Sequence, residues 1–247
     1  MTIIRKVSSN WDARIWFEGT GWAERRLELT PEIAGWEFLS FRTYTFRAGQ
    51  VIDGESADDE MAMVLLSGAI TMEVAGPGWS DTWEMRGRSD VFDGPPFALY
   101  LPPGHTYKLT LHADADCAYG RAPATGARPP RLIRPEEQVA APSSAFGPQV
   151  TQIFGSNVAE NLSCSQVAIP AGGWAFSEQG EHGARNEVAY FRMEPESGWA
   201  VQRLIGPDGL DETFAVRHGD AVAVRGGVHP LVAGPSTVVY VLRFAVG

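Results

Sequence analysis

Two histidines and a glutamate in the C-terminal half of the chain have side chains that can hold a metal ion. His182 and Glu187 lie close together in the stretch GEHGARNEVAYF, and His229 ends the stretch GDAVAVRGGVH. Imidazole nitrogen and carboxylate oxygen are ligands of divalent metals such as zinc, and a catalytic site keeps one coordination position open. The three residues predict a metal site if the fold brings their strands together.

Each of these residues also has a simpler interpretation when it is taken alone. A histidine beside a Gly-rich turn is more often solvated or hydrogen-bonded than metal-bound. A lone glutamate is most simply interpreted as a charge at a strand edge. His105, in the first half of the chain, has no upstream histidine and glutamate set. Only the combination of His182, Glu187 and His229 favours a site.

The segments that must position these residues alternate apolar and polar side chains, as half-buried β-strands do. The 27 glycines and 17 prolines favour many short strands joined by tight turns. Strands are expected at residues 35–47, 60–74 with a break at Ser67 and Gly68, 98–101, 107–111, 149–154, 162–169, 187–193, 199–205, 221–224 and 238–245.

Residues 121–149 differ from the rest of the chain because they are rich in proline and have no regular period. Their prolines exclude a long helix or a central strand. We therefore expect an ordered connector at 121–149 between an N-terminal barrel at 1–120 and a C-terminal barrel at 150–247. A weak repeat supports two similar halves. Each half places a glycine, an apolar strand, a Gly-containing turn and a histidine in the same order, ending at His105 and His229.

Composition and charge exclude several classes of protein. The net charge of −10 argues against a nucleic-acid partner, because phosphate binding needs clustered Lys and Arg. The sequence has no apolar run of membrane-spanning length, and its start lacks the apolar region of a secretory signal. Cys117 and Cys164 lie far apart without a CxxC pattern, which predicts reduced thiols in a cytoplasmic protein.

Several stretches resemble the cupin superfamily, and more narrowly the bicupin family that includes 5-deoxy-glucuronate isomerase of inositol catabolism and a relative acting on a deoxy-ketouronate from pectin. The stretches span most of the chain in the family's order, and VFDGPPFALYLPPG is long and unusual. They are VLLSG, GRSDVFDGPPFALYLPPG, RLIRPE, NEVAYFR, QRLIGPDGLDE and HGDAVAVRGGVHP.

This resemblance implies an all-β bicupin fold of two jelly-roll barrels, with a divalent metal in the C-terminal one. Zinc is the expected metal, with manganese or iron as alternatives. Carried over from the family motif, the metal ligands are His182, Glu187 and His229. The motif's first histidine falls at Gly180, which has no side chain to offer, and Arg225 replaces a proline near the last histidine.

The missing ligand leaves three outcomes open. Three residues and water still make a catalytic metal set. Glu178 or Glu181 is an acidic replacement, which would favour a harder metal such as manganese. In the third outcome the site is degenerate, holds no cofactor, and the barrel binds a ligand without turning it over.

The activity implied by the resemblance is aldose–ketose isomerisation of a deoxy-uronic acid, in which a proton moves between adjacent carbons through an enediol. A metal would polarise the carbonyl, and a base would take the proton. The expected catalytic residues are Glu187, Tyr190 and Glu178. The carboxylate of a sugar acid needs a cation, and the expected substrate-binding residues are Gln202, Arg203, Arg185 and Arg225.

Two other functions compete with the isomerase. A non-catalytic or repurposed bicupin that binds a small carboxylate or sugar is the main alternative, because of Gly180. An iron-dependent cupin oxygenase also fits a set of two histidines and one carboxylate, although the family stretches argue against it. In either case we expect a small-molecule ligand and a homo-oligomer, a dimer in the first instance, because exposed β edges favour pairing.

Overall fold

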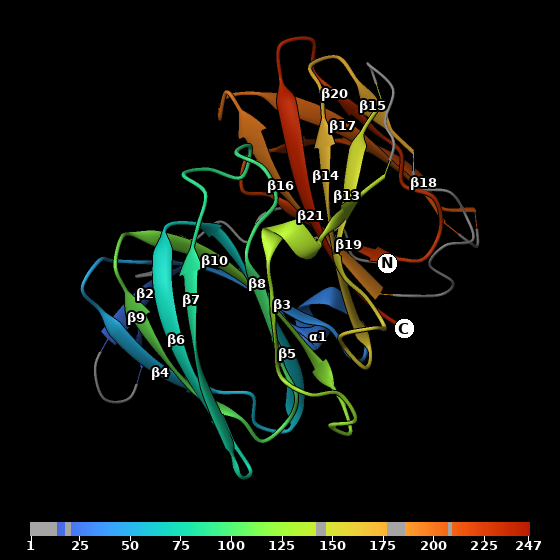
Figure 1. Ribbon diagram of the computed structural model, residues 1–247. Coiled ribbons are helices and arrows are strands. Elements are labelled where there is room, and N and C mark those ends of the chain that lie inside the picture. Colours follow the sequence, from blue (N-terminus) through green and yellow to red (C-terminus); the bar gives the residue numbers. More distant parts are fainter. Residues whose placement is uncertain (1–13, 18–20, 142–146, 177–185, 207–208) are drawn as a thin grey trace.

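The chain folds into two β-barrels that lie side by side, the first coloured blue to green and the second yellow to red (Figure 1). The computed structural model describes residues 14–17, 21–141, 147–176, 186–206 and 209–247. The expectation of an all-β bicupin fold is confirmed, because each half contains two antiparallel sheets of the jelly-roll kind. No helix in these ranges has the length and apolar character needed to span a bilayer.

In the first half, a seven-stranded sheet of order β1-β2-β3-β10-β5-β8-β11 faces a four-stranded sheet of order β4-β9-β6-β7. The elements are β1 (Arg14–Phe17), β2 (Gly21–Leu29), α1 (Pro31–Ala34), β3 (Ser40–Phe46), β4 (Val51–Glu55), β5 (Asp59–Ser67), β6 (Ala69–Gly76), β7 (Trp79–Arg86), β8 (Ala98–Leu101), β9 (Thr106–Leu111), β10 (Ala115–Pro123) and β11 (Arg131–Ile133).

In the second half, a six-stranded sheet of order β12-β13-β14-β21-β16-β19 faces a four-stranded sheet of order β15-β20-β17-β18. The elements are η1 (Pro135–Glu137), β12 (Val139–Ala140), β13 (Gln149–Phe154), β14 (Leu162–Ile169), β15 (Trp174–Ala175), β16 (Asn186–Glu194), β17 (Trp199–Ile205), β18 (Asp211–Arg217), β19 (Ala221–Arg225), β20 (Leu231–Ala233) and β21 (Val238–Val246).

The proline-rich connector contributes strands only at sheet edges. β11 pairs with β8 at the edge of the first large sheet, and β12 pairs with β13 at the edge of the second. An edge strand tolerates nearby proline because one side of its backbone makes no ladder hydrogen bonds. The division of the chain at residues 120 and 149 stays a prediction, although β10 already continues to Pro123.

One predicted strand starts too early. The pattern at residues 35–47 suggested a single strand, but β3 begins at Ser40. The short helix α1 ends at Ala34, before the predicted strand begins. Its N-cap Thr30 accepts a hydrogen bond from Ile33 N, and its C-cap is Gly35 in the left-handed conformation, so residues 35–39 form the turn between α1 and β3. Trp36 is buried and donates to the Leu39 carbonyl, so its apolar character reflects a packed turn.

Three hydrophobic cores follow from the alternation of side chains across each strand. One fills the first barrel and includes Met63 and Leu109, and a second fills the second barrel and includes Phe191 and Val241. The third lies between the two large sheets, where Phe41 of the first half packs against Phe244 of the second. Both cysteines are buried free thiols, and burial raises the pKa of each.

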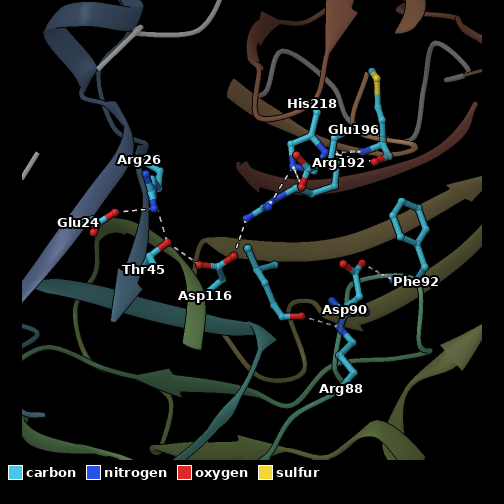
Figure 2. Close-up of polar contacts among 12 residues, drawn as sticks. Glu24, Arg26, Thr45, Arg88, Asp90, Phe92, Asp116, Arg192, Glu196 and His218 are labelled. Carbon is cyan, nitrogen blue, oxygen red and sulfur yellow. Dashed lines mark hydrogen bonds and ion pairs between the residues drawn. The ribbon is translucent and has the colours of Figure 1, made fainter. Parts of the chain in front are cut away.

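Polar side chains also join the two barrels. Figure 2 shows Arg192 of β16 directed at Asp116 of β10, and its Nη2 donates to Asp116 Oδ2 at 2.9 Å. The other nitrogen, Nη1, lies 3.1 Å from His218 Nε2. Arg88 is buried and contacts Gln166 and Tyr240 of the second half. These contacts and the shared core favour a fixed relation between the barrels.

Candidate metal and substrate site

Glu187 lies at the start of β16 with its side chain directed into the second barrel. Its strand alternates, so that Glu187, Ala189 and Phe191 share the inward face while Val188 and Tyr190 face the first barrel. The carboxylate side chain is only 5% exposed. A buried carboxylate carries a large desolvation cost unless a cation, a metal or donors surround it.

His229 reaches the same interior from the turn that follows β19. Gly227 has φ +93°, and a Cβ atom there would overlap the carbonyl oxygen of Ile205. The next residue, Val228, forms an antiparallel bridge with Ile205 at the end of β17. The close contact with β17 fixes the direction of the turn and brings the His229 side chain, 3% exposed, inside the barrel.

Two further polar residues lie in this interior. Gln202 is the inward-facing residue of its part of β17 and is buried. Arg243 of β21 stands between the inward-facing Val241 and Ala245, and its backbone pairs with Ala189 of β16. Four different strands or turns of the second barrel thus direct a polar side chain to one place.

The four side chains are close together. His229 Nε2 lies 3.5 Å from Glu187 Oε1, and Arg243 Nε lies 3.6 Å from the same oxygen. Gln202 Nε2 lies 3.5 Å from His229 Nδ1. These separations are at or beyond the limit of a good hydrogen bond. The four side chains are therefore neighbours, but they make no strong hydrogen bonds with one another.

The donor set fits a divalent metal. Glu187 Oε1 and Gln202 Oε1 are buried without a hydrogen-bond partner among the described residues, and a buried polar atom of this kind calls for a ligand, an ion or water. Carboxylate oxygen, imidazole nitrogen and amide oxygen are ordinary ligands for such an ion. Within the described ranges, no group of three or more His, Cys, Asp and Glu side chains is placed so that it could hold a metal ion. His182, the remaining predicted ligand, lies outside them.

The other residues that the sequence placed at this site divide into two groups. Glu178, Gly180, Glu181 and Arg185 lie outside the described residues, like His182. Tyr190, Arg203 and Arg225 are described, and the structure brings none of them to Glu187 and His229.

Tyr190 belongs to the core between the barrels, where its ring packs 5.8 Å from that of Phe41. It follows Glu187 on the same strand but at an odd spacing, so the two side chains lie on opposite faces of the sheet. Burial raises the pKa of Tyr190 above its ordinary value. The expectation of a catalytic Tyr190 is corrected, because its ring lies in the core between the barrels, on the other face of the sheet from Glu187.

The two arginines also point elsewhere. Arg203 neighbours Gln202 but faces outward, where its guanidinium makes two hydrogen bonds of 2.7 and 2.6 Å with Asp211. Arg225 follows the inward-facing Val224, and its side chain lines a surface hollow shared with Trp36 of the first half. Of the expected substrate-binding residues that the structure describes, only Gln202 reaches the site.

Sequence reasoning missed Arg243. Its signal is present in VVYVLRFAV, where one charged residue interrupts an apolar strand that is buried on both faces. A charge in such a strand needs a partner inside the protein, which makes it a candidate for a functional site.

The chain was compared with known families and proteins. Residues 19–247 match the KduI/IolB family. The 5-deoxy-glucuronate isomerase of Geobacillus thermodenitrificans is 33% identical over 236 residues, which cover 90% of this chain and 84% of that protein. The protein of the same name from Bacillus subtilis (strain 168) is 24% identical, with 89% of this chain and 85% of that protein covered.

Solved structures agree with the fold. An IolB-like protein of Salmonella typhimurium LT2 superposes with a TM-score of 0.82 at 26% identity, covering 96% of this chain and 93% of that one. Oxalate decarboxylase of Bacillus subtilis gives a TM-score of 0.73 at 16% identity, covering 99% and 78%. At this lower identity the likeness shows the bicupin fold alone.

Proposed function

The chain belongs to the KduI/IolB family, and from this premise we propose that it is a 5-deoxy-glucuronate isomerase whose active site is the interior of the second barrel. The observation that carries this proposal is that His229 and Arg243 lie beside a buried Glu187 oxygen without a hydrogen-bond partner among the described residues, with Gln202 on the other side of the His229 ring. The relatives named for this activity support the reaction.

Glu187 and His229, with His182 from outside the described residues, are the proposed ligands of a divalent metal. A metal bound there would act as a Lewis acid on the carbonyl and hydroxyl of the sugar. Zinc is the first candidate by ligand type, and manganese is the second, since a solved oxalate decarboxylase of the same fold has Mn(II) centres.

The His229 ring must carry its proton on Nδ1 if Nε2 is to offer a lone pair. Gln202 is the described side chain beside Nδ1. A half-turn of its carboxamide brings Oε1, now without a partner, to the place where it accepts that proton. Gln202 is therefore proposed to position His229 and not to touch the reacting carbons.

Arg243 is the proposed partner of the sugar's carboxylate. Its Nε lies 3.6 Å from Glu187 Oε1, its side chain is 14% exposed, and its Nε has no hydrogen-bond partner among the described residues. A planar guanidinium can form two parallel hydrogen bonds with a carboxylate. This proposes for Arg243 the task that the sequence had suggested for Arg203, with Arg185 and Arg225 as alternatives.

The proton transfer between adjacent carbons needs a base besides the metal ligands. With Tyr190 directed away, Glu178 is the remaining candidate from the sequence, and it lies outside the described residues. Glu187 takes this task only if it does not hold the metal.

The test is an isomerase assay together with elemental analysis of protein purified without chelator. We expect near-stoichiometric divalent metal, turnover of 5-deoxy-glucuronate, and loss of both in Glu187→Gln and His229→Ala. Glu212→Gln, on the exposed strand β18, is the matched control and should keep both. Absence of turnover with zinc, manganese, iron and cobalt would sink the proposal.

A protein that binds a sugar acid without converting it is the second candidate, because Gly180 stands where the family motif has a histidine. It predicts no bound metal but a rise in melting temperature with the sugar acid. The expected homo-oligomer is a separate proposal that a molar mass from light scattering checks.

A further inference from the structure

The first barrel repeats the topology of the second but not its chemistry. The strand order β3-β10-β5-β8 in the first half corresponds to β14-β21-β16-β19 in the second, and β4-β9-β6-β7 corresponds to β15-β20-β17-β18. Every strand of the second barrel that carries a site residue therefore has a counterpart in the first. The residues at the matching positions can be read from the strand registers.

The matching position of Glu187 is occupied by a methionine. Glu187 pairs with Val224, the last inward-facing residue of β19, and Met61 pairs with Leu101, the last inward-facing residue of β8. A thioether in place of the carboxylate removes the hard ligand that a zinc or manganese site of this kind uses. The same register puts Tyr119 where the second barrel has Arg243.

The interior of the first barrel nevertheless holds a cavity with polar walls. Its volume is about 100 Å³, and its lining contains arginine, tyrosine and apolar side chains. The lining residues are Arg42, Tyr44, Phe46, Ile52, Met61, Tyr107, Tyr119 and Arg121. Among the described lining residues there are two cations and three phenols but no carboxylate.

The two arginines are only partly neutralised by their neighbours. Arg42 Nε donates to Glu28 at 2.7 Å, and Glu28 also pairs with Arg25. Arg121 Nη2 donates to the Ser56 carbonyl, while its buried Nε lies 3.5 Å from Asp59 and makes no hydrogen bond with the described residues. The three arginines and two carboxylates together carry a net charge of +1, with Arg25 next to the lining residues and not among them.

The phenols are hydrogen-bond donors that stay neutral. Burial raises the pKa of Tyr44, Tyr107 and Tyr119, that of Tyr107 to about 12. Each hydroxyl therefore keeps its proton at neutral pH and can donate it to an anion. A buried cavity with donors, one uncompensated positive charge and no acceptor carboxylate is complementary to a small monoanion.

We propose that the first barrel binds a small monocarboxylate of two or three carbons, without a metal, between Arg121, Arg42 and the three tyrosines. The cavity volume of about 100 Å³ equals the volume that roughly three water molecules occupy in the liquid. This space suits such a ligand better than a whole sugar acid. A planar carboxylate also matches the fork of an arginine better than a sphere-like anion does.

Calorimetric titration with glycolate, and with glycolamide as its neutral counterpart, tests this proposal. The protein carries Arg243→Met, which removes the proposed carboxylate-binding arginine of the second barrel, so that binding there does not contribute. We expect one glycolate per chain and no detectable binding of glycolamide. The isomerase proposal can fail without changing this result, because the titration measures no turnover.

Two variants locate the bound glycolate. Arg121→Met should weaken binding at least about ten-fold, since it removes a charge-assisted hydrogen bond. Tyr107→Phe removes only a hydroxyl, so it keeps the test valid if Arg121→Met does not fold. Arg86→Met is the matched control, because that arginine is 86% exposed on β7, and it should bind as the parent protein does.

Three results would overturn the proposal. Equal binding of glycolate and glycolamide would show that charge is not recognised. Unchanged binding in both Arg121→Met and Tyr107→Phe would show that the cavity is not the site. Binding that appears only when Arg243 is restored would assign the glycolate to the second barrel.

Discussion

A neighbouring amide contributes to the orientation of His229. Gln202 Nε2 lies 3.5 Å from His229 Nδ1, and the opposite ring nitrogen lies 3.5 Å from Glu187 Oε1. A second partner of this kind fixes the tautomer and the angle of an imidazole ligand. The ring and the carboxylate act together only when the ring proton is held on the side away from Glu187.

Replacing Gln202 by leucine therefore lowers both metal affinity and turnover. Loss of such a partner costs about 10- to 100-fold in comparable metal sites. Gln202→Glu, which keeps an acceptor oxygen, should recover much of the loss. Metal titration monitored by fluorescence and kcat measured at saturating metal check this prediction. Equal behaviour of the leucine and glutamate variants would contradict it.

Arg243 and Arg203 provide a matched pair for the recognition of the substrate's carboxylate. Arg243→Met should raise KM for 5-deoxy-glucuronate about 100-fold, because a desolvated charge pair is lost. Arg203→Met should leave KM near that of the parent, because Arg203 pairs with Asp211 on the outer surface. Steady-state kinetics of both variants test the assignment, and a larger effect for Arg203 would reverse it.

The sequence could predict which residue types form the site better than it could predict their directions. The motif predicted Glu187 and His229 as metal ligands, and their side chains lie 3.5 Å apart, while their role as ligands stays a prediction. It could not separate Gln202 from Arg203, because a shift of one residue along a strand reverses the face of the sheet. The face of each residue depends on pairing with distant strands, which no local pattern contains.

At the scale of elements, the turn after β19 sets the site. Gly226 and Gly227 both have positive φ, and Gly227 lies against the backbone of Ile205. The turn in the first half, Pro102-Pro103-Gly104, occupies the corresponding place between β8 and β9. Its Gly104 also has positive φ, but open space surrounds the position of an added Cβ atom.

Alanine at these two glycines should give different results. Gly104→Ala introduces only backbone strain, which costs about 1 kcal/mol of stability. Gly227→Ala adds a steric overlap with Ile205, so the turn shifts, His229 moves and turnover falls at least about ten-fold. Urea unfolding and the isomerase assay measure the two effects separately. A Gly227→Ala variant with full turnover would show that the turn does not position His229.

Strands were predictable where their side chains alternate or form a short apolar run. The predictions for 98–101, 149–154, 162–169 and 199–205 agree with the observed bounds. The missed strands include β7 and β18, which lie at the edges of the two four-stranded sheets. Their residues are mostly exposed, so burial leaves little apolar pattern in the sequence.

At the scale of the whole molecule, one buried carboxylate connects the two barrels. Glu60 of β5 is fully buried and accepts hydrogen bonds from the backbone N–H groups of Glu160, Asn161 and Leu162, at 2.8, 2.8 and 2.6 Å. It also accepts one from the Tyr100 hydroxyl at 2.9 Å. These hydrogen bonds hold the start of β14 against the first barrel.

Glu60→Gln should therefore destabilise the whole chain although it preserves the shape of the side chain. The amide replaces an acceptor oxygen by an N–H₂ group facing backbone donors, which leaves a buried donor unpaired and costs roughly 1–3 kcal/mol. Glu73→Gln, on the exposed face of β6, is the matched control. Urea unfolding should show a lower midpoint for Glu60→Gln alone, with an unchanged slope. Equal midpoints for the two variants would mean that the apolar core between the barrels, and not Glu60, determines their association.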